Sequence, residues 1–184
     1  MRCLLGLMMA AASLLTLAPA HVRAMDGIDA CLVFTQADAS GLLQTDVSPG
    51  VSRGAVSPAG GSCRYTFSRD GDLYGLTLVH CTDATIAGEG IYGSAADVMA
   101  RQLRARQDSQ SASALLRILP NLGDEAFWDG SALWMRKGSH LVRVTPDPYV
   151  PGPFADMSAA SAAKLERSLE LALAAAGTIS ARLP

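Results

Sequence analysis

The hexapeptide GEGIYG, Gly88–Gly93, matches the Gly-x-Gly-x-x-Gly pattern with which many enzymes bind the phosphates of a dinucleotide. In that motif the first glycine ends a parallel strand, and the helix opens inside the motif so that its N-terminus meets the pyrophosphate. Here a connecting segment precedes Gly88, and the next predicted helix begins only after Gly93. Asp108, near the position of the acid that would bind the ribose, falls at the end of that helix. We therefore interpret the motif as a flexible linker and expect no nucleotide cofactor.

Two further groups of residues have side chains suited to hydrolytic chemistry. His80 and Cys81 are the types of a base and a nucleophile, but neighbouring residues of a strand point to opposite faces, so they cannot form a catalytic contact. Asp124 and Glu125, with the distant His140, form a candidate acid–base group. The simpler interpretation of the acidic pair is a solvated turn before a strand. The histidines beyond the N-terminal segment lack partners at metal-ligand spacing, so we expect no metal site and no catalytic residues.

The N-terminus has the features of a secretory signal peptide. A basic residue starts it, and Leu4–Leu17 is an apolar stretch too short to span a bilayer. Small residues then offer two cleavage sites, Ala18–Ala20 and Val22–Ala24, of which we prefer the second. We therefore expect a signal peptide over residues 1–24 and a single domain over residues 25–184. An uncleaved anchor helix is the alternative.

The exported chain has an acidic balance and no signal for a lipid anchor. Loss of Arg2 and Arg23 with the signal peptide takes the basic side chains from 15 to 13 against 17 acidic ones, a net charge of −4. We therefore expect no attraction to nucleic acid or to anionic lipid. No cysteine stands at either cleavage point, and no later segment is long and apolar enough to span a membrane. These features predict a soluble periplasmic or secreted protein.

Of the four cysteines, three remain after cleavage, which in an oxidising compartment predicts one disulfide and one free thiol. The segment between Cys63 and Cys81 is typical of a hairpin that turns at Asp70-Gly71, a strong two-residue turn signal. In that register Cys63 and Cys81 point to opposite faces of the hairpin. We therefore expect a Cys31–Cys63 disulfide and a buried, unreactive Cys81.

Capping signals and hydrophobic spacing predict the other elements. Thr35 and Ser94 each stand three residues before an aspartate, which predicts two helix starts, and a third helix is expected over residues 156–176 with Gly177 as its stop. A meander of three short strands follows Asp124. Hairpin connections make the strands antiparallel. The predicted fold class is therefore α+β: an antiparallel sheet, built from the hairpin and the meander, with about three helices packed on one face.

The last hairpin of the meander carries a candidate interaction surface. With a two-residue turn at Lys137-Gly138, strand alternation directs Leu133 and its equivalents to the core and directs Trp134, Arg136 and Arg143 outward. A tryptophan between arginines suits partner recognition, because these residue types dominate interface hot spots. Two alternatives stay open: a helix covers this face, or the arginines only stack on the ring.

Three short motifs, Cys31–Asp38, Cys63–Tyr65 and Leu122–Trp128, together resemble small secreted cell-envelope proteins of unknown function, many of them actinobacterial lipoproteins. Those chains tend to have a cysteine before a Thr-x-Ala-Asp helix, a Cys-x-aromatic strand and a Gly-Leu-Gly-Asp-x-Ala-aromatic strand entry. The resemblance covers most of the exported chain and supports the Cys31–Cys63 pairing. This sequence departs from the pattern because it lacks a lipobox and has Asn121 where the first glycine would stand. The resemblance implies location and fold more than activity.

Three classes of function remain. The leading hypothesis is a non-enzymatic binding or protein-interaction module that uses the surface around Trp134 to capture an envelope protein. The first alternative is a small-ligand carrier with a pocket between the sheet and the helices. The second is an envelope hydrolase with a site assembled from Asp124, Glu125 and His140. The sequence leaves both the partner and the oligomeric state open.

Overall fold

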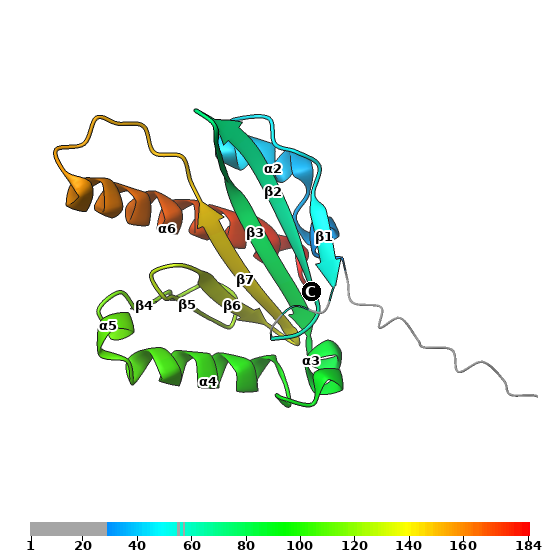
Figure 1. The fold of residues 1–184 in the computed structure, drawn as a ribbon. Coiled ribbons are helices and arrows are strands. Elements are labelled where there is room, and N and C mark those ends of the chain that lie inside the picture. Colours follow the sequence, from blue (N-terminus) through cyan, green and yellow to red (C-terminus); the bar gives the residue numbers. More distant parts are fainter. Residues whose placement is uncertain (1–28, 55, 57) are drawn as a thin grey trace, which may run out of the picture.

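The computed structural model describes residues 29–54, 56 and 58–184, so the predicted signal peptide lies outside the described residues. One antiparallel sheet lies between two sets of helices, which makes the fold α+β (Figure 1). The helices are α1 (Ala30–Val33), α2 (Gln36–Leu43), α3 (Asp83–Glu89), α4 (Ala95–Gln107), α5 (Gln110–Ser113) and α6 (Met157–Arg182). The strands are β1 (Val51–Gly54), β2 (Gly61–Arg69), β3 (Asp72–Thr82), β4 (Arg117–Ile118), β5 (Glu125–Trp128), β6 (Leu133–Lys137) and β7 (His140–Asp147).

Within the described residues the sheet has seven strands in the order β1-β2-β3-β7-β6-β5-β4, and all neighbouring pairs are antiparallel. The β2–β3 hairpin turns at Asp70-Gly71, which confirms the predicted register. The meander is also confirmed, but Lys137 pairs with His140, so its second turn is Gly138-Ser139 and not Lys137-Gly138. This displaces the register by an even number of residues, which leaves the predicted faces unchanged.

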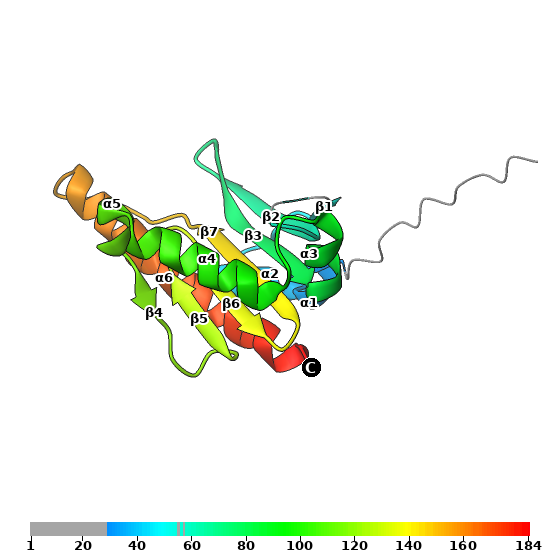
Figure 2. The ribbon, with the colours of Figure 1, turned by 90° about the horizontal axis from the view of Figure 1, so that it is seen from below.

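The helices cover both faces of the sheet, which corrects the prediction that they lie on one. On the first face, α1, α2 and α6 pack over side chains such as Tyr65 and Leu78. On the second face, α3 and α4 pack over Phe127, Trp134 and Leu141. Figure 1 shows α4 and α6 on opposite sides of strands β4, β5 and β6, and Figure 2 shows the same layers from below. The reason is that β5, β6 and β7 have large apolar residues at both odd and even positions, so each face needs a cover.

The two helix starts predicted from capping signals are confirmed. Thr35 and Asp38 form a complete capping box at the start of α2. The side chain of Ser94 accepts a hydrogen bond from the backbone N–H of Asp97 at the start of α4. The motif GEGIYG overlaps the end of α3, with Gly90 as a left-handed C-cap at φ 74°, and then connects α3 to α4. A dinucleotide-binding loop follows a strand of a parallel sheet, whereas β3, the strand before this motif, is paired antiparallel with its neighbours.

Helix α6 is longer than the sequence predicted. It begins after the cap residue Asp156 and continues through Gly177 to Arg182. Burial explains the difference, because Ile179 on the next turn packs in the core and makes continuation favourable despite the glycine. Residues 162, 165, 169, 173 and 176 have the spacing of one apolar stripe along this helix, but Leu173 is 39% exposed.

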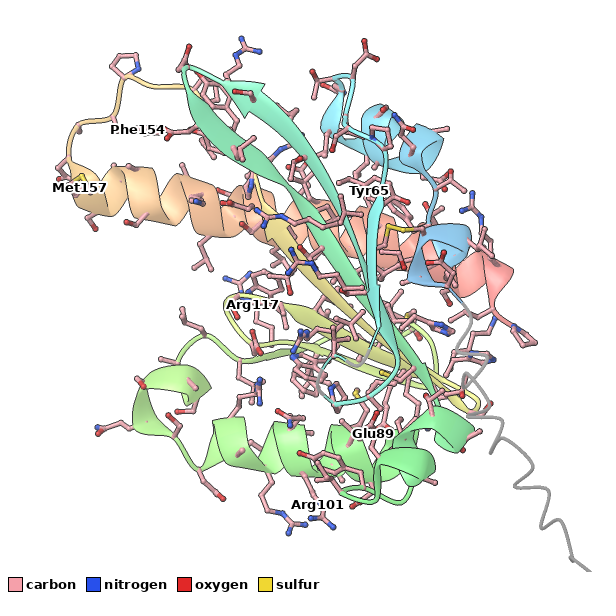
Figure 3. All side chains as sticks on the ribbon, turned by 45° about the vertical axis from the view of Figure 1, so that its right-hand side comes forward. Tyr65, Glu89, Arg101, Arg117, Phe154 and Met157 are labelled. Atoms are coloured by element: carbon pink, nitrogen blue, oxygen red, sulfur yellow. A yellow bond between two sulfur atoms is a disulfide. The ribbon has the colours of Figure 1, made fainter. Side chains whose placement is uncertain are left out.

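The predicted disulfide is confirmed. Cys31 and Cys63 are bonded with an S–S distance of 2.00 Å, which ties α1 to β2, while Cys81 is a free, buried thiol on the second face. Tyr65 lies beside the disulfide (Figure 3) and donates a hydrogen bond to the carbonyl oxygen of Phe34. This junction holds the N-terminal helices against the sheet.

Candidate functional site

Trp134 lies in the interior, which corrects the expectation of an exposed interaction surface. Its side chain does point to the second face, but α4 covers it and only 3% of the residue is exposed. The guanidinium groups of Arg106 and Arg143 lie 5.1 Å and 5.3 Å from the ring centroid. Both alternatives left open by the sequence are therefore realised: a helix covers this face, and arginines stack on the ring.

Asp129 organises the polar groups around this tryptophan. Its carboxylate accepts hydrogen bonds at 2.9 Å from both Trp134 Nε1 and Arg106 Nε. Burial opposes its ionisation, but hydrogen bonds from Ala132, Trp134 and the adjacent serine outweigh burial and hold its pKa below the usual value. Burial lowers the pKa of Arg143, whose Nε is buried without a hydrogen-bond partner among the described residues. The cluster joins α4 to the sheet, and its contacts are structural.

The structure separates the residues of the hypothetical hydrolase site. Arg136 Nη1 lies 2.7 Å from Asp124 Oδ2, and Arg136 Nε lies 2.5 Å from Glu125 Oε1. Arg136 shares the second face with Trp134, because the two alternate with residues of the first face along β6. His140 is buried on the first face, where its Nδ1 lies 3.0 Å from His80 Nε2. The carboxylates and His140 therefore belong to opposite faces of the sheet.

One hydrolase-like pattern was missed by the sequence-based expectation of no catalytic residues. Residues Gly50–Gly54 spell Gly-x-Ser-x-Gly, the motif of a serine nucleophile at a strand-to-helix turn. Here Ser52 lies within the edge strand β1, and its hydroxyl donates to Asp29 Oδ1 at 3.2 Å. Strand β2 separates it from His80 on β3. A Cβ on Gly50 would lie 2.7 Å from the sulfur of Cys63, so packing against the disulfide explains this glycine.

The candidate functional site is a cleft at the place where the sheet forks, which we call the fork cleft. Strand β7 is paired with β3 up to Asp147, whereas its pairing with β6 ends at Val144. Beyond that point β7 and the β5–β6 turn are separated by a cavity of about 550 Å³, with α6 on its far side. The lining residues are Arg64, Gly75, Leu76, Thr77, Gly130, Ser131, Thr145, Pro146, Asp147, Ser161, Lys164, Leu165 and Ser168. Ligand pockets commonly have volumes of about 300–1,000 Å³.

The N-terminal part of α6 forms one wall of the fork cleft. After β7 the chain runs outward through residues 148–156 and then returns in α6, so this part of the helix projects beyond the sheet (Figure 1). Phe154 and Met157 mark the outer end of this projection (Figure 3). On α6, Ser161, Lys164 and Ser168 share one side of the helix, and that side faces the cleft.

Hydroxyl groups and charges give the fork cleft a polar lining. Leu76, Pro146 and Leu165 contribute apolar surface. Five lining side chains carry hydroxyl groups: Thr77, Ser131, Thr145, Ser161 and Ser168. Lys164 Nζ lies 2.8 Å from Asp147 Oδ1, with both side chains about half exposed. Arg64 is the third charged residue of the lining, and within the described residues no carboxylate lies within ion-pair distance of it. The lining therefore has one uncompensated positive charge.

The same described part of the chain lacks two other kinds of site. It contains no group of three or more His, Cys, Asp or Glu residues placed to hold a metal ion. None of its helices combines the length and apolarity needed to cross a membrane. Comparisons with protein-family models, curated proteins and solved structures found no match to the chain. The resemblance to secreted envelope proteins therefore stays a prediction.

Proposed function

We propose that this protein is a non-enzymatic binding protein of the periplasm or the extracellular space, and that it carries a small polar molecule in the fork cleft. The cleft itself is the observation that supports this proposal. It has the volume of a small-molecule site, and polar groups from β2, β3, β7, the β5–β6 turn and α6 converge on it.

Two features support the proposed location. The Cys31–Cys63 disulfide is the kind of bond that persists in oxidising compartments outside the cytosol. The N-terminal sequence also has the basic start, the short apolar core and the small-residue cleavage sites of a signal peptide. An exported carrier would meet small molecules of the medium or the cell envelope.

The carrier hypothesis now ranks above protein capture by the tryptophan–arginine surface. Recognition of a protein by Trp134 would need its ring to be accessible, and α4 covers it. Arg136 is engaged by two carboxylates. The fork cleft, by contrast, presents groups that a small ligand can reach.

A variant that fills the cleft tests the proposal. Ser161 is an exposed residue of α6 that lines the cleft, so Ser161→Trp should place a large ring inside it without disturbing the core. Ala174→Trp is the matched control, because Ala174 is exposed on a side of the same helix that does not line the cleft. The measurement is native mass spectrometry of each protein isolated from the envelope fraction of its own host.

The proposal predicts that wild-type protein and Ala174→Trp retain an additional mass of roughly a few hundred daltons, the size of a ligand that a pocket of this class buries. Ser161→Trp should appear without it. If the additional mass persists in Ser161→Trp, or if a partner of protein size accompanies wild type instead, the carrier proposal is wrong.

A further inference from the structure

The fork cleft has a directional arrangement of side chains that constrains its ligand. Arg64, Thr77 and Thr145 are directly paired neighbours on β2, β3 and β7, so they form one row across the second face of the sheet. Neighbouring strands lie about 4.8 Å apart, which places the backbone at Arg64 about 10 Å from that at Thr145. A ligand that lies along this row meets a cation at one end, hydroxyls in the middle and the fork at the other end.

The charges of the cleft favour a ligand with a single anionic group. At the fork end, Lys164 and Asp147 already satisfy each other at 2.8 Å. At the other end, Arg64 presents a planar guanidinium suited to two parallel hydrogen bonds with a carboxylate or phosphate. Arg143 lies two residues before Thr145 on the same strand face and adds positive potential. A ligand with an ammonium group is less favoured, because Asp147, the carboxylate of the lining, already pairs with Lys164.

The hydroxyl lining indicates what the rest of the ligand must be. A hydroxyl can donate one hydrogen bond and accept others, so a row of Thr and Ser side chains matches a ligand that itself carries several hydroxyls. Thr77, Thr145 and Ser131 contribute from the sheet side, while Ser161 and Ser168 contribute from α6. The aliphatic lining residues can contact the C–H groups of such a ligand.

We propose that the ligand of the fork cleft is a sugar or polyol bearing one carboxylate or phosphate, with its anion on Arg64 and its hydroxyls on the Thr and Ser lining. This inference rests on the proposed function, because it names the ligand class of the same cleft. Carboxylate and phosphate are alternative anionic groups that the Arg64 guanidinium binds through the same kind of hydrogen bonds, and the experiment separates them.

Isothermal titration calorimetry of the protein, expressed with its leader and purified after export, tests the ligand class. Four probes are compared: glucuronate, glucose 6-phosphate, glucose and inorganic phosphate. The inference predicts saturable binding of glucuronate or glucose 6-phosphate, and at least tenfold weaker binding of glucose and of inorganic phosphate. The better of the two acidic sugars identifies the source of the charge. Equal affinity for glucose and glucuronate would overturn the inference.

Two substitutions on the same sheet face identify the residue that binds the anion. Arg64→Gln removes one charged hydrogen-bond partner and should weaken binding of the acidic sugar about 10- to 100-fold, whereas Arg64→Lys should restore part of it. Arg53→Gln is the matched control, because Arg53 is an exposed arginine on the second face of β1, outside the cleft. It should change affinity less than about twofold, which is the scale of a remote charge. An unchanged affinity in Arg64→Gln would overturn the assignment.

Backbone amide chemical shifts, recorded with the same four probes, separate failure of this inference from failure of the carrier proposal. Shifts of the Thr77, Thr145 and Ser168 amides with glucose alone would keep the cleft as a binding site and overturn the acidic ligand. Binding of an acidic sugar that shifts only residues outside the cleft would overturn both. If none of the probes binds, the acidic-sugar class is wrong, and the native mass measurement still decides whether the cleft carries something else.

Discussion

Trp134 illustrates how much the role of a residue depends on what covers it. Strand alternation correctly places its side chain on the second face of the sheet, together with Arg143. Whether that face is solvent or core depends on α4, which lies far away in sequence from β6. The guanidinium groups of Arg106 and Arg143 contact its ring, and its Nε1–H donates a hydrogen bond to Asp129. Trp134 is therefore a residue of the second-face core.

Removal of the Trp134 side chain should therefore destabilise the fold itself, and its effect should not be limited to weaker binding of a partner protein. Trp134→Ala leaves a cavity beneath α4 and deprives Asp129 of a donor, so we expect a loss of about 3–5 kcal/mol in the free energy of unfolding, measured by urea denaturation. Ile91→Ala is the control, because Ile91 is 66% exposed and its loss should cost little. A Trp134→Ala protein with wild-type stability would contradict this account of the second face.

The residues of the fork cleft could not be found from the sequence. Arg64, Thr77 and Thr145 come from three strands, and only the strand order and both registers bring them into one row. Thr and Ser at such positions look like ordinary solvent-facing residues of a strand. The sequence did suggest a pocket between sheet and helices as one alternative, but it gave no residue that would line it.

At the scale of elements, local signals were the most reliable guide. The Asp70-Gly71 turn fixed the register of β2–β3, and the cap residues Thr35 and Ser94 marked true helix starts. Signals that depend on tertiary burial failed. The sequence predicts a helix stop at Gly177, yet packing of Ile179 continues α6 to Arg182. It does not predict α3, because this is a short helix directly after a strand.

Helix α6 offers a prediction of increased stability. Gly177 lies inside the helix, is exposed, and would have no atom within 4 Å of an added Cβ. Gly177→Ala should therefore raise the free energy of unfolding by about 0.5–1 kcal/mol, because alanine loses less backbone entropy in a helix. Thermal denaturation measures the effect. Gly75→Ala is the contrasting variant and should destabilise, because its Cβ would collide with the Tyr65 carbonyl oxygen. A lowered melting temperature in Gly177→Ala would argue against a continuous α6.

The contact between α2 and the end of α6 has a defined pH dependence. Arg182 hydrogen-bonds both carboxylate oxygens of Asp38, and this holds the pKa of Asp38 well below its usual value. An aspartate side chain in the unfolded chain has a pKa of about 3.9. Because the folded-state pKa is the lower one, the ion pair contributes stability above about pH 4, and that contribution is lost as pH falls toward the folded-state pKa.

Asp38→Asn should accordingly be less stable than wild type at neutral pH. The difference should shrink as the pH falls below about 4, because the unfolded wild-type chain then takes up a proton on Asp38 while the folded protein still holds the carboxylate charged. Urea denaturation at a series of pH values measures the difference. Asp46→Asn serves as the control, because Asp46 is an exposed acid and its replacement should produce no such pH-dependent gap. A gap that is independent of pH would show that the ion pair contributes nothing.

At the scale of the whole molecule, the fork cleft exists because β7 is longer than the segment of it that pairs with β6. β7 extends past the end of its pairing with β6, and residues 148–156 carry the chain outward before α6 returns across the opening. Helices α4 and α6 cover the two faces of the sheet at β6, whereas the second face of β1 and β2 carries exposed residues such as Arg53 and Arg64. The disulfide lies on the first face of β2, where Cys63 directly precedes the cleft residue Arg64 of the second face. A binding site at a sheet irregularity, with a helix as one wall, is the arrangement that supports the carrier proposal.

The most direct test of the central claim is a crystal structure of the protein purified from the envelope of its own host, without added ligand. If the fork cleft carries a sugar-like ligand, the electron density should show a small hydroxylated molecule there, within hydrogen-bond distance of Arg64, Thr77 or Thr145. The carrier proposal would be contradicted if the cleft contained only water while the native mass of the same protein showed a bound molecule or a protein partner, since the binding site would then lie outside the cleft.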